Sequence, residues 1–116
     1  MTEQRRDNHS TEFGIWLRKQ KEIDSSFGFL ATNIDYMWRN YKTGKWMLIE
    51  EKRYNTPAKE WQKRMFEVLH SSIKHGDYRG FHYLVFEKTT PEDGKMWLDH
   101  KLINKEQLIK FLRFEA

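Results

Sequence analysis

The chain has 116 residues, of which 33% are charged and 16% are aromatic, and its formal net charge is +4 at pH 7. This length suits one domain with a single modest core, and the many large aromatic side chains exclude a chain that is disordered throughout. The sequence contains no cysteine, which excludes a disulfide framework, a thiolate nucleophile and a cysteine zinc site.

The sequence composition also restricts the expected location and partners of the protein. No apolar run approaches the roughly 18 residues that span a bilayer, and no signal-peptide pattern opens the chain. We therefore expect no membrane partner and a cytoplasmic protein, in the host cytoplasm if the chain is viral. The net positive charge mildly favours polyanionic partners.

The first third of the chain predicts a tail, a helix and a strand. Residues 1–9 are polar and predict a loose tail, so that residues 10–116 form the predicted domain. A helix is predicted to run to about Ile23, with a hydroxyl cap before it and Glu12 in its first turn. Phe27 to Thr32 then predicts a first strand.

Two further strands are predicted on either side of a turn. Asn40 to Lys45 supplies the turn, with Gly44 available for a positive φ. The strand from Trp46 to Lys52 is apolar on both faces until it reaches its acidic residues. This pattern predicts an interior strand whose polar end opens into a cleft.

The main functional hypothesis is based on the acidic residues of this hairpin. Side chains alternate along a strand, so Glu50 and Lys52 share one face while Glu51 lies on the other. Asp35 on the neighbouring strand and Glu50 are two carboxylates that can bind a hard divalent cation. The alternative is a solvated strand end with an ordinary surface ion pair.

A second helix is predicted to start at Thr56-Pro57 and to run to about Lys74, with Gly76 closing it in a left-handed conformation. Gln62 lies near its N-terminal end, at the edge of the apolar stripe. The polar side carries three cations that are either solvated or available to hold phosphate: Lys59, Lys63 and Arg64.

The C-terminal part predicts two strands and a helix. Tyr78 to Thr89 predicts a strand, and Lys95 to Leu98 predicts an edge strand after a turn. Asn104 then caps a final helix in a capping-box-like pattern with Gln107. The predicted fold class is α/β, a mixed sheet flanked by helices.

The order of Asp35 and Glu50-Glu51-Lys52 along a hairpin resembles the PD-(D/E)XK nuclease superfamily, which has the restriction-endonuclease-like fold. Asn-Ile-Asp35 stands where the family has Pro-Asp, and Glu51 stands where the family more often has an apolar residue. Gln62 and Glu12 match further positions of the site in some members. The resemblance covers roughly residues 11 to 90 and implies an α-β-β-β-α-β core with an extra C-terminal hairpin and helix.

The resemblance implies a metal-dependent nuclease that hydrolyses phosphodiester bonds of DNA. It implies that Asp35 and Glu50, with a backbone carbonyl of Glu51, bind Mg²⁺ or Mn²⁺, and that Lys52 orients the attacking water. It places Gln62 and Glu12 beside them. So small a domain favours structure-selective or nonspecific cleavage, as in Holliday-junction resolvases and phage endonucleases, with branched or single-stranded DNA as candidate substrates and a homodimer as candidate assembly.

Two other classes of function stay open from the sequence. One is a catalytically silent relative that keeps the fold and binds nucleic acid or protein. The other is an interaction module in which Asp35 and Glu50 are surface residues without cation affinity.

Overall fold

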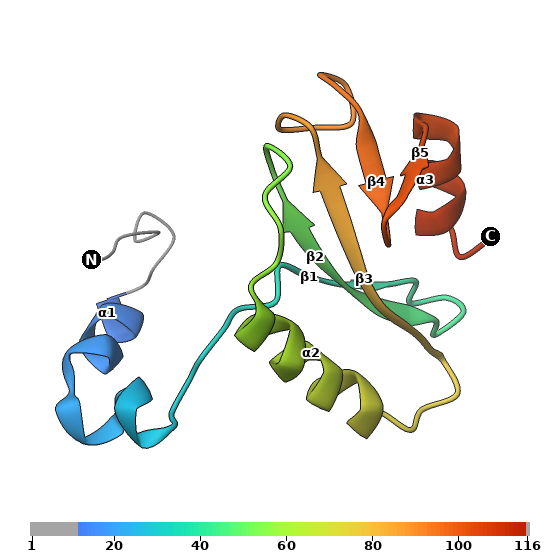
Figure 1. Ribbon diagram of the computed structural model, residues 1–116. Helices are drawn as coiled ribbons and strands as arrows, with labels where there is room; N and C mark the ends of the chain where they lie inside the picture. Colours follow the sequence, from blue (N-terminus) through green and yellow to red (C-terminus); the bar gives the residue numbers. More distant parts are fainter. Residues whose placement is uncertain (1–11, 116) are drawn as a thin grey trace. The chain divides into compact units, whose positions relative to one another are not determined.

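The computed structural model describes residues 12–115, and the chain divides after Thr32 into two compact units (Figure 1). The predicted tail, residues 1–9, lies outside the described residues. The first unit contains α1 (Glu12–Lys19) and two 3-10 turns, η2 (Lys21–Ile23) and η3 (Ser25–Phe27). The predicted helix is therefore shorter than expected and ends in 3-10 turns.

The strand predicted for residues 27–32 is wrong. Asp24 accepts hydrogen bonds from the backbone of Ser26 at 3.0 Å and, through its carbonyl, of Phe27 at 3.1 Å. Gly28 follows with φ of 94° and donates to the Ser25 carbonyl. These local bonds form a turn where the apolar residues had indicated a strand.

The second unit is built on a five-stranded mixed sheet in the order β1-β2-β3-β4-β5. The strands are β1 (Tyr36–Arg39), β2 (Trp46–Lys52), β3 (Tyr78–Phe86), β4 (Met96–Leu98) and β5 (Lys101–Ile103). Only β2 and β3 pair in parallel within this sheet. A parallel pair needs a crossover connection, which α2 (Glu60–Ser72) supplies. The predicted α/β class and the C-terminal hairpin and helix, α3 (Lys105–Leu112), are confirmed.

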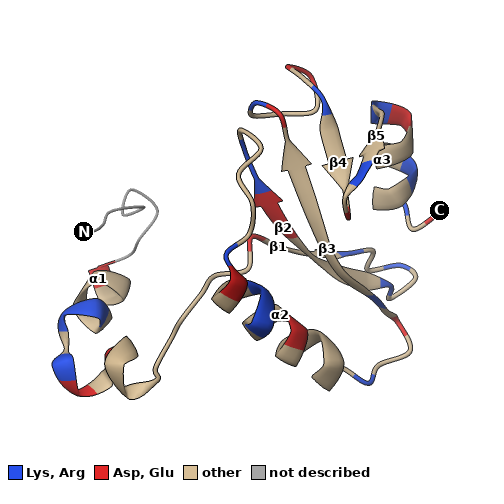
Figure 2. Ribbon diagram, viewed as in Figure 1, with Lys and Arg blue, Asp and Glu red and all other residues tan. Residues whose placement is uncertain are grey.

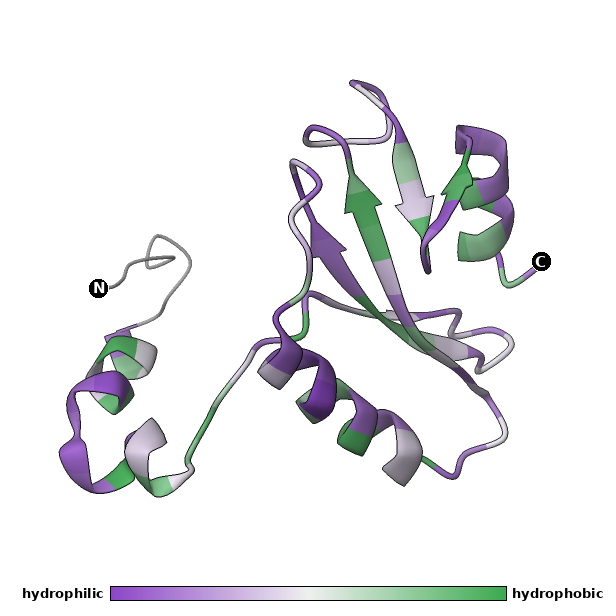
Figure 3. Ribbon diagram, in the orientation of Figure 1, coloured by the Kyte–Doolittle hydropathy of each residue, from purple (hydrophilic) through white to green (hydrophobic). Residues whose placement is uncertain are grey.

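Each face of the sheet packs against one helix. On one face, Phe66 of α2 stacks on Phe81 of β3 with ring centroids 4.4 Å apart. On the other face, Leu108 of α3 joins a core of buried residues from three strands: Met47, Ile49, Leu84, Phe86 and Met96. Hydrophobic residues follow β3 while the end of β2 is hydrophilic (Figure 3). The polar end of β2 therefore lies beside an apolar stretch of β3, with Glu51 paired to Leu84 and Lys52 paired to Val85.

The predicted turns agree with the structure more closely than the predicted helix boundaries do. The hairpin turn is confirmed by the Asn40 N–H bond to the Lys45 carbonyl at 2.9 Å and by Gly44 with φ of 86°. α2 begins at Glu60 rather than at Thr56-Pro57, and the residue before it, Lys59, has an extended backbone. The Asn55 N–H donates to the Phe86 carbonyl at 3.0 Å. That bond ties the connection after β2 to the end of β3.

The C-terminal boundaries shift in the same way. α2 ends at Ser72, and Gly76 is not among the positive-φ glycines. β3 ends at Phe86 instead of Thr89, and β4 is not the edge strand because β5 pairs with it. The capping box of α3 is confirmed, with the Asn104 side chain accepting from the Gln107 N–H at 2.8 Å.

Candidate active site

Strand alternation places Glu50 and Lys52 on the face of the sheet that α2 covers. Glu50 pairs in register with Tyr83 of β3, whose ring lies 6.2 Å from the ring of Phe66 of α2. The Lys52 Nζ lies 3.4 Å from Glu50 Oε2. The predicted assignment of Glu50 to the Lys52 face is therefore confirmed.

Asp35 lies directly before β1 and meets the same two positions of β2. Its backbone N–H donates to Glu50 Oε1 at 3.4 Å. Its carboxylate Oδ2 accepts from the backbone N–H of Glu51 at 2.8 Å. The second bond fixes the Asp35 carboxylate against the β2 backbone.

Gln62, in the first turn of α2, contacts both Lys52 and Glu50. Its Oε1 accepts a hydrogen bond from Lys52 Nζ at 3.1 Å, and its Nε2 donates to Glu50 Oε2 at 3.4 Å. One amide thus bridges the cation and the anion. The structure brings together Asp35, Glu50, Lys52 and Gln62 as the sequence predicts.

Within the group of Asp35, Glu50, Lys52 and Gln62, the Glu50 carboxylate is buried and has a raised pKa. It is only 3% exposed, and burial followed by the neighbouring Asp35 carboxylate raises its pKa to about 7, against the lowering effect of Lys52. Tyr83, packed beside it, has a raised pKa through burial and through the charge of Glu50. The negative charge of Asp35 and the positive charge of Lys52 thus act on Glu50 in opposite directions, and an added cation would favour the charged carboxylate.

The donor set fits a hard divalent cation. Mg²⁺ is bound in proteins through one or two carboxylates, with the remaining positions left to water and to substrate phosphate. Asp35 and Glu50 are such a pair. Among the described residues, no group of three or more acidic or histidine side chains is placed to hold a metal ion.

The side chain of Glu51 belongs to the opposite face. One of its carboxylate oxygens accepts from the Tyr36 hydroxyl at 3.2 Å, and the other pairs with Arg53 Nε at 2.8 Å. Its carboxylate is therefore outside the group around Glu50. The metal role predicted for Glu51 concerns its backbone carbonyl and stays a prediction.

The other predicted residues differ in position. Glu12 lies on α1 of the first unit, so its role in the site stays a prediction. Lys63 forms an ion pair with Glu60 at 3.7 Å along α2, whereas Lys59 and Arg64 are exposed. Positively charged residues of α2 lie close to the acidic end of β2 (Figure 2).

A cavity of about 290 Å³ adjoins the group at Lys52. Its lining comes from the end of β2, the β2–α2 connection, α2, β3, β4 and the β4–β5 turn: Lys52, Asn55, Thr56, Pro57, Ala58, Lys63, Tyr83, Val85, Trp97 and His100. Tyr83, Trp97 and His100 were not predicted as functional residues from the sequence. Only the register between distant strands places them here, and no sequence motif marks them.

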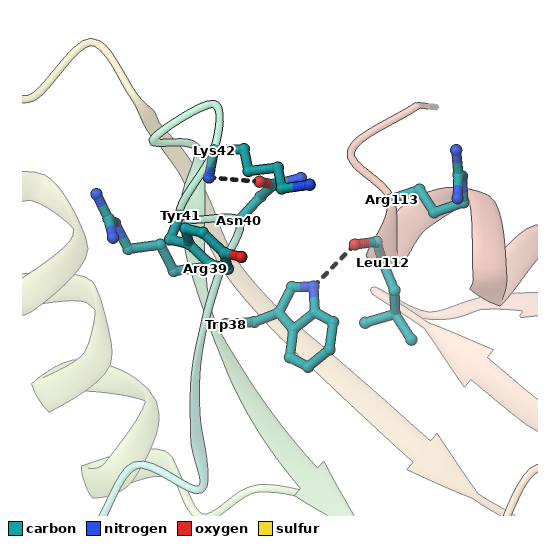
Figure 4. A pocket seen from close by; sticks show the side chains of 7 residues that line it. All are labelled: Trp38, Arg39, Asn40, Tyr41, Lys42, Leu112 and Arg113. Atoms are coloured by element: carbon teal, nitrogen blue, oxygen red, sulfur yellow. Dashed lines mark hydrogen bonds between the residues drawn. The ribbon is translucent and has the colours of Figure 1, made fainter.

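A second cavity, of about 420 Å³, lies between the β1–β2 turn and the end of α3 (Figure 4). The Trp38 indole crosses it and donates to the Leu112 carbonyl at 2.8 Å, while Tyr41 is 78% exposed. Its lining contains aromatic and cationic residues but no carboxylate. The paired carboxylates therefore distinguish the group around Glu50 as the candidate active site.

Comparison of the chain with protein-family models, curated proteins and solved structures gives no match. Among residues 12–115, no helix has the length and apolar character needed to cross a membrane.

Proposed function

We propose that the protein is a metal-dependent nuclease that hydrolyses phosphodiester bonds of DNA. The observation that carries the proposal is the buried Glu50, held with Asp35 beside Lys52 at the polar end of β2. Burying a carboxylate is unfavourable unless the site compensates its charge. The order of these residues resembles the PD-(D/E)XK superfamily, which uses such a group for phosphodiester hydrolysis.

The side chains of the group have distinct tasks in this proposal. Asp35 and Glu50 hold the cation, and when bound, Mg²⁺ or Mn²⁺ supplies a Lewis acid for the phosphodiester. The Lys52 ammonium orients the attacking water and stabilises negative charge that develops on the phosphate oxygens. Gln62 holds Lys52 in place through the bond at 3.1 Å.

The substrate backbone would contact the cations on α2. Lys63 lines the cavity beside Lys52, and Lys59 and Arg64 extend the positive charge along the helix. Phosphate contacts of this kind carry no sequence information and weaken as salt increases. We therefore propose that cleavage is nonspecific or structure-selective. A homodimer would provide two sites and so cut two strands.

The test is cleavage of labelled single-stranded, duplex and four-way-junction DNA with Mg²⁺, Mn²⁺ or EDTA. We expect metal-dependent cleavage that Asp35→Asn abolishes and that Lys52→Ala slows by about 10²–10³-fold. Glu106→Gln and Lys42→Ala are the matched controls, because both are exposed residues outside the group around Glu50.

Two outcomes would overturn the proposal. Wild-type protein that binds DNA with a steep salt dependence but cuts none of the substrates would instead be a catalytically silent nucleic-acid-binding module. Cleavage that survives Asp35→Asn would come from a contaminating enzyme or from another site.

A further inference from the structure

The cavity beside Lys52 exists because α2 leaves one end of the sheet uncovered. Lys52 pairs in register with Val85, and Val85 pairs with Trp97, so the three side chains form a row across β2, β3 and β4 on the same face. α2 begins only at Glu60, and residues 55–58 border the row instead of covering it. The cavity therefore follows from the strand register and from the start of α2 at Glu60.

The lining of this cavity combines an apolar floor with polar donors at its edge. Val85 and Trp97 supply the floor, and Pro57 and Ala58 supply a wall. Lys52, Lys63 and His100 supply nitrogen groups that can bind anions. No acidic residue is among the lining residues, although Glu50 adjoins Lys52.

The chemistry suits a ligand that carries a flat apolar ring and a negative charge. Aromatic side chains such as Trp97 stack on nucleobases, and lysine and histidine contact phosphate. The volume of about 290 Å³ is just below the range of about 300–1,000 Å³ for small-molecule sites, which suits a ligand no larger than a single nucleotide.

We propose that this cavity binds one unpaired nucleotide next to the scissile phosphate, with the base against Trp97 and the adjoining phosphate towards Lys63 and His100. This inference rests on the proposed nuclease function and names its substrate class. A base that is stacked and paired in a duplex cannot enter a lateral cavity without leaving the helix, which costs a few kcal/mol. The preferred substrates are therefore DNA strands that already contain an unpaired nucleotide, such as single strands and frayed or branched duplexes.

The backbone at His100 is consistent with this assignment. Asp99 and His100 form the two-residue turn between β4 and β5 with φ of 49° and 72°, where glycine or asparagine is the usual choice. Histidine is one of the few residues other than glycine that are enriched at positive φ. The tight turn therefore accommodates His100 and places its imidazole at the edge of the cavity.

The first measurement is binding without cleavage. Full-length protein in EDTA is titrated into a short single-stranded DNA with one central 2-aminopurine, and into the matched duplex, with fluorescence and anisotropy as readouts. We expect quenching of the base on the single strand and an affinity at least about tenfold higher than for the duplex. Equal affinity for the two DNAs would overturn the inference.

Two variants test the cavity itself. Ala58→Trp fills it, and His100→Gly removes an edge group while relieving the positive-φ backbone, so that the second variant is expected to fold at least as stably as the wild type. We expect each to weaken single-strand binding by about threefold to tenfold and to leave duplex binding unchanged. Lys42→Ala, an exposed lysine of the other cavity, is the charge control.

The outcomes separate this inference from the nuclease proposal. If both variants bind the single strand like the wild type, or if Lys42→Ala weakens it equally, the nucleotide site is refuted even when the protein cuts DNA. If the variants lose single-strand preference while no DNA is cut under any condition, the nucleotide site stands and the nuclease proposal fails.

Discussion

At the scale of single residues, Glu50 has the most unfavourable position for folding in the second unit. Its carboxylate is 3% exposed, and its pKa is raised to about 7 by burial and then by Asp35. Lys52 and Gln62 offset only part of this cost. A group that lowers stability in this way is typical of a functional site.

We therefore predict that Glu50→Gln makes the metal-free protein more stable while it abolishes cleavage. At pH 8 the wild-type carboxylate is charged, and the neutral amide removes an electrostatic cost of about 1–3 kcal/mol. The measurement is urea unfolding in EDTA, beside a cleavage assay. Glu106→Gln, at an exposed acid of α3, is the control and should leave cleavage unchanged. A loss of stability in Glu50→Gln would show that Glu50 is a structural residue.

His82 is a second residue with a shifted pKa, and it lies on the face of the sheet opposite Glu50. Its Nδ1 lies 2.7 Å from Asp99 Oδ2, and its Nε2 lies 2.7 Å from the Arg79 carbonyl oxygen. Both partners are acceptors, so this arrangement favours the charged ring, in which both nitrogens carry a proton. Although burial disfavours that charge, the bonds to Asp99 and Arg79 raise the pKa of His82 above its ordinary value.

This pair predicts a defined pH dependence of stability. Because the pKa of His82 is raised on folding, the folded state binds the proton more tightly, and the contribution is complete below about pH 6.5 and is lost as the pH rises through the folded value. Asp99→Asn should therefore cost about 1 kcal/mol at pH 6, since Asp99 is partly exposed, and less at pH 9. Urea unfolding at the two pH values tests this, and an equal loss at both would contradict it.

At the scale of elements, β3 requires glycine at position 80. Gly80 has φ of 102°, and an added Cβ would lie 3.1 Å from His82 Nε2. We predict that Gly80→Ala destabilises the protein by about 1–3 kcal/mol through backbone strain. Gly76→Ala is the matched control, because Gly76 has an ordinary φ and no atom within 4 Å of an added Cβ. A thermal melt in which both variants behave alike would refute the role of Gly80.

Element boundaries were the least predictable part of the fold. The Thr56-Pro57 pattern is a good local start for a helix, yet Lys59 is extended and α2 starts only at Glu60. The apolar residues after Phe27 indicated a strand, but Asp24 and Gly28 form a local turn. In that turn, specific hydrogen bonds override the propensity of the apolar residues.

At the scale of the whole molecule, the sequence predicts the residues that lie close along the hairpin and misses those that depend on strand register. Asp35, Glu50 and Lys52 follow from a tight turn and from side-chain alternation, which are local rules. Trp97 and His100 reach the same region only because β4 pairs with β3 and β3 pairs in parallel with β2. No local pattern encodes that register.

The division after Thr32 predicts that residues 33–116 fold without the first unit. Both apolar layers of the sheet, Phe66 on Phe81 and the core around Met47 and Leu108, are formed within this segment. We expect the fragment 33–116 to unfold in a single cooperative transition by circular dichroism, because each layer keeps its contacts. A fragment without such a transition would show that the first unit is required for folding.

The same fragment determines whether α1 contributes to catalysis. If Glu12 belongs to the site, as the resemblance implies, the folded fragment should cut DNA far more slowly than the full chain, and Glu12→Ala in the full chain should be equally slow. Glu22→Ala, an exposed acid of the same unit, is the control. If the fragment and Glu12→Ala both cut at the wild-type rate, the role of Glu12 is refuted. The chemistry then needs Asp35, Glu50, Lys52 and Gln62 without any residue of the first unit.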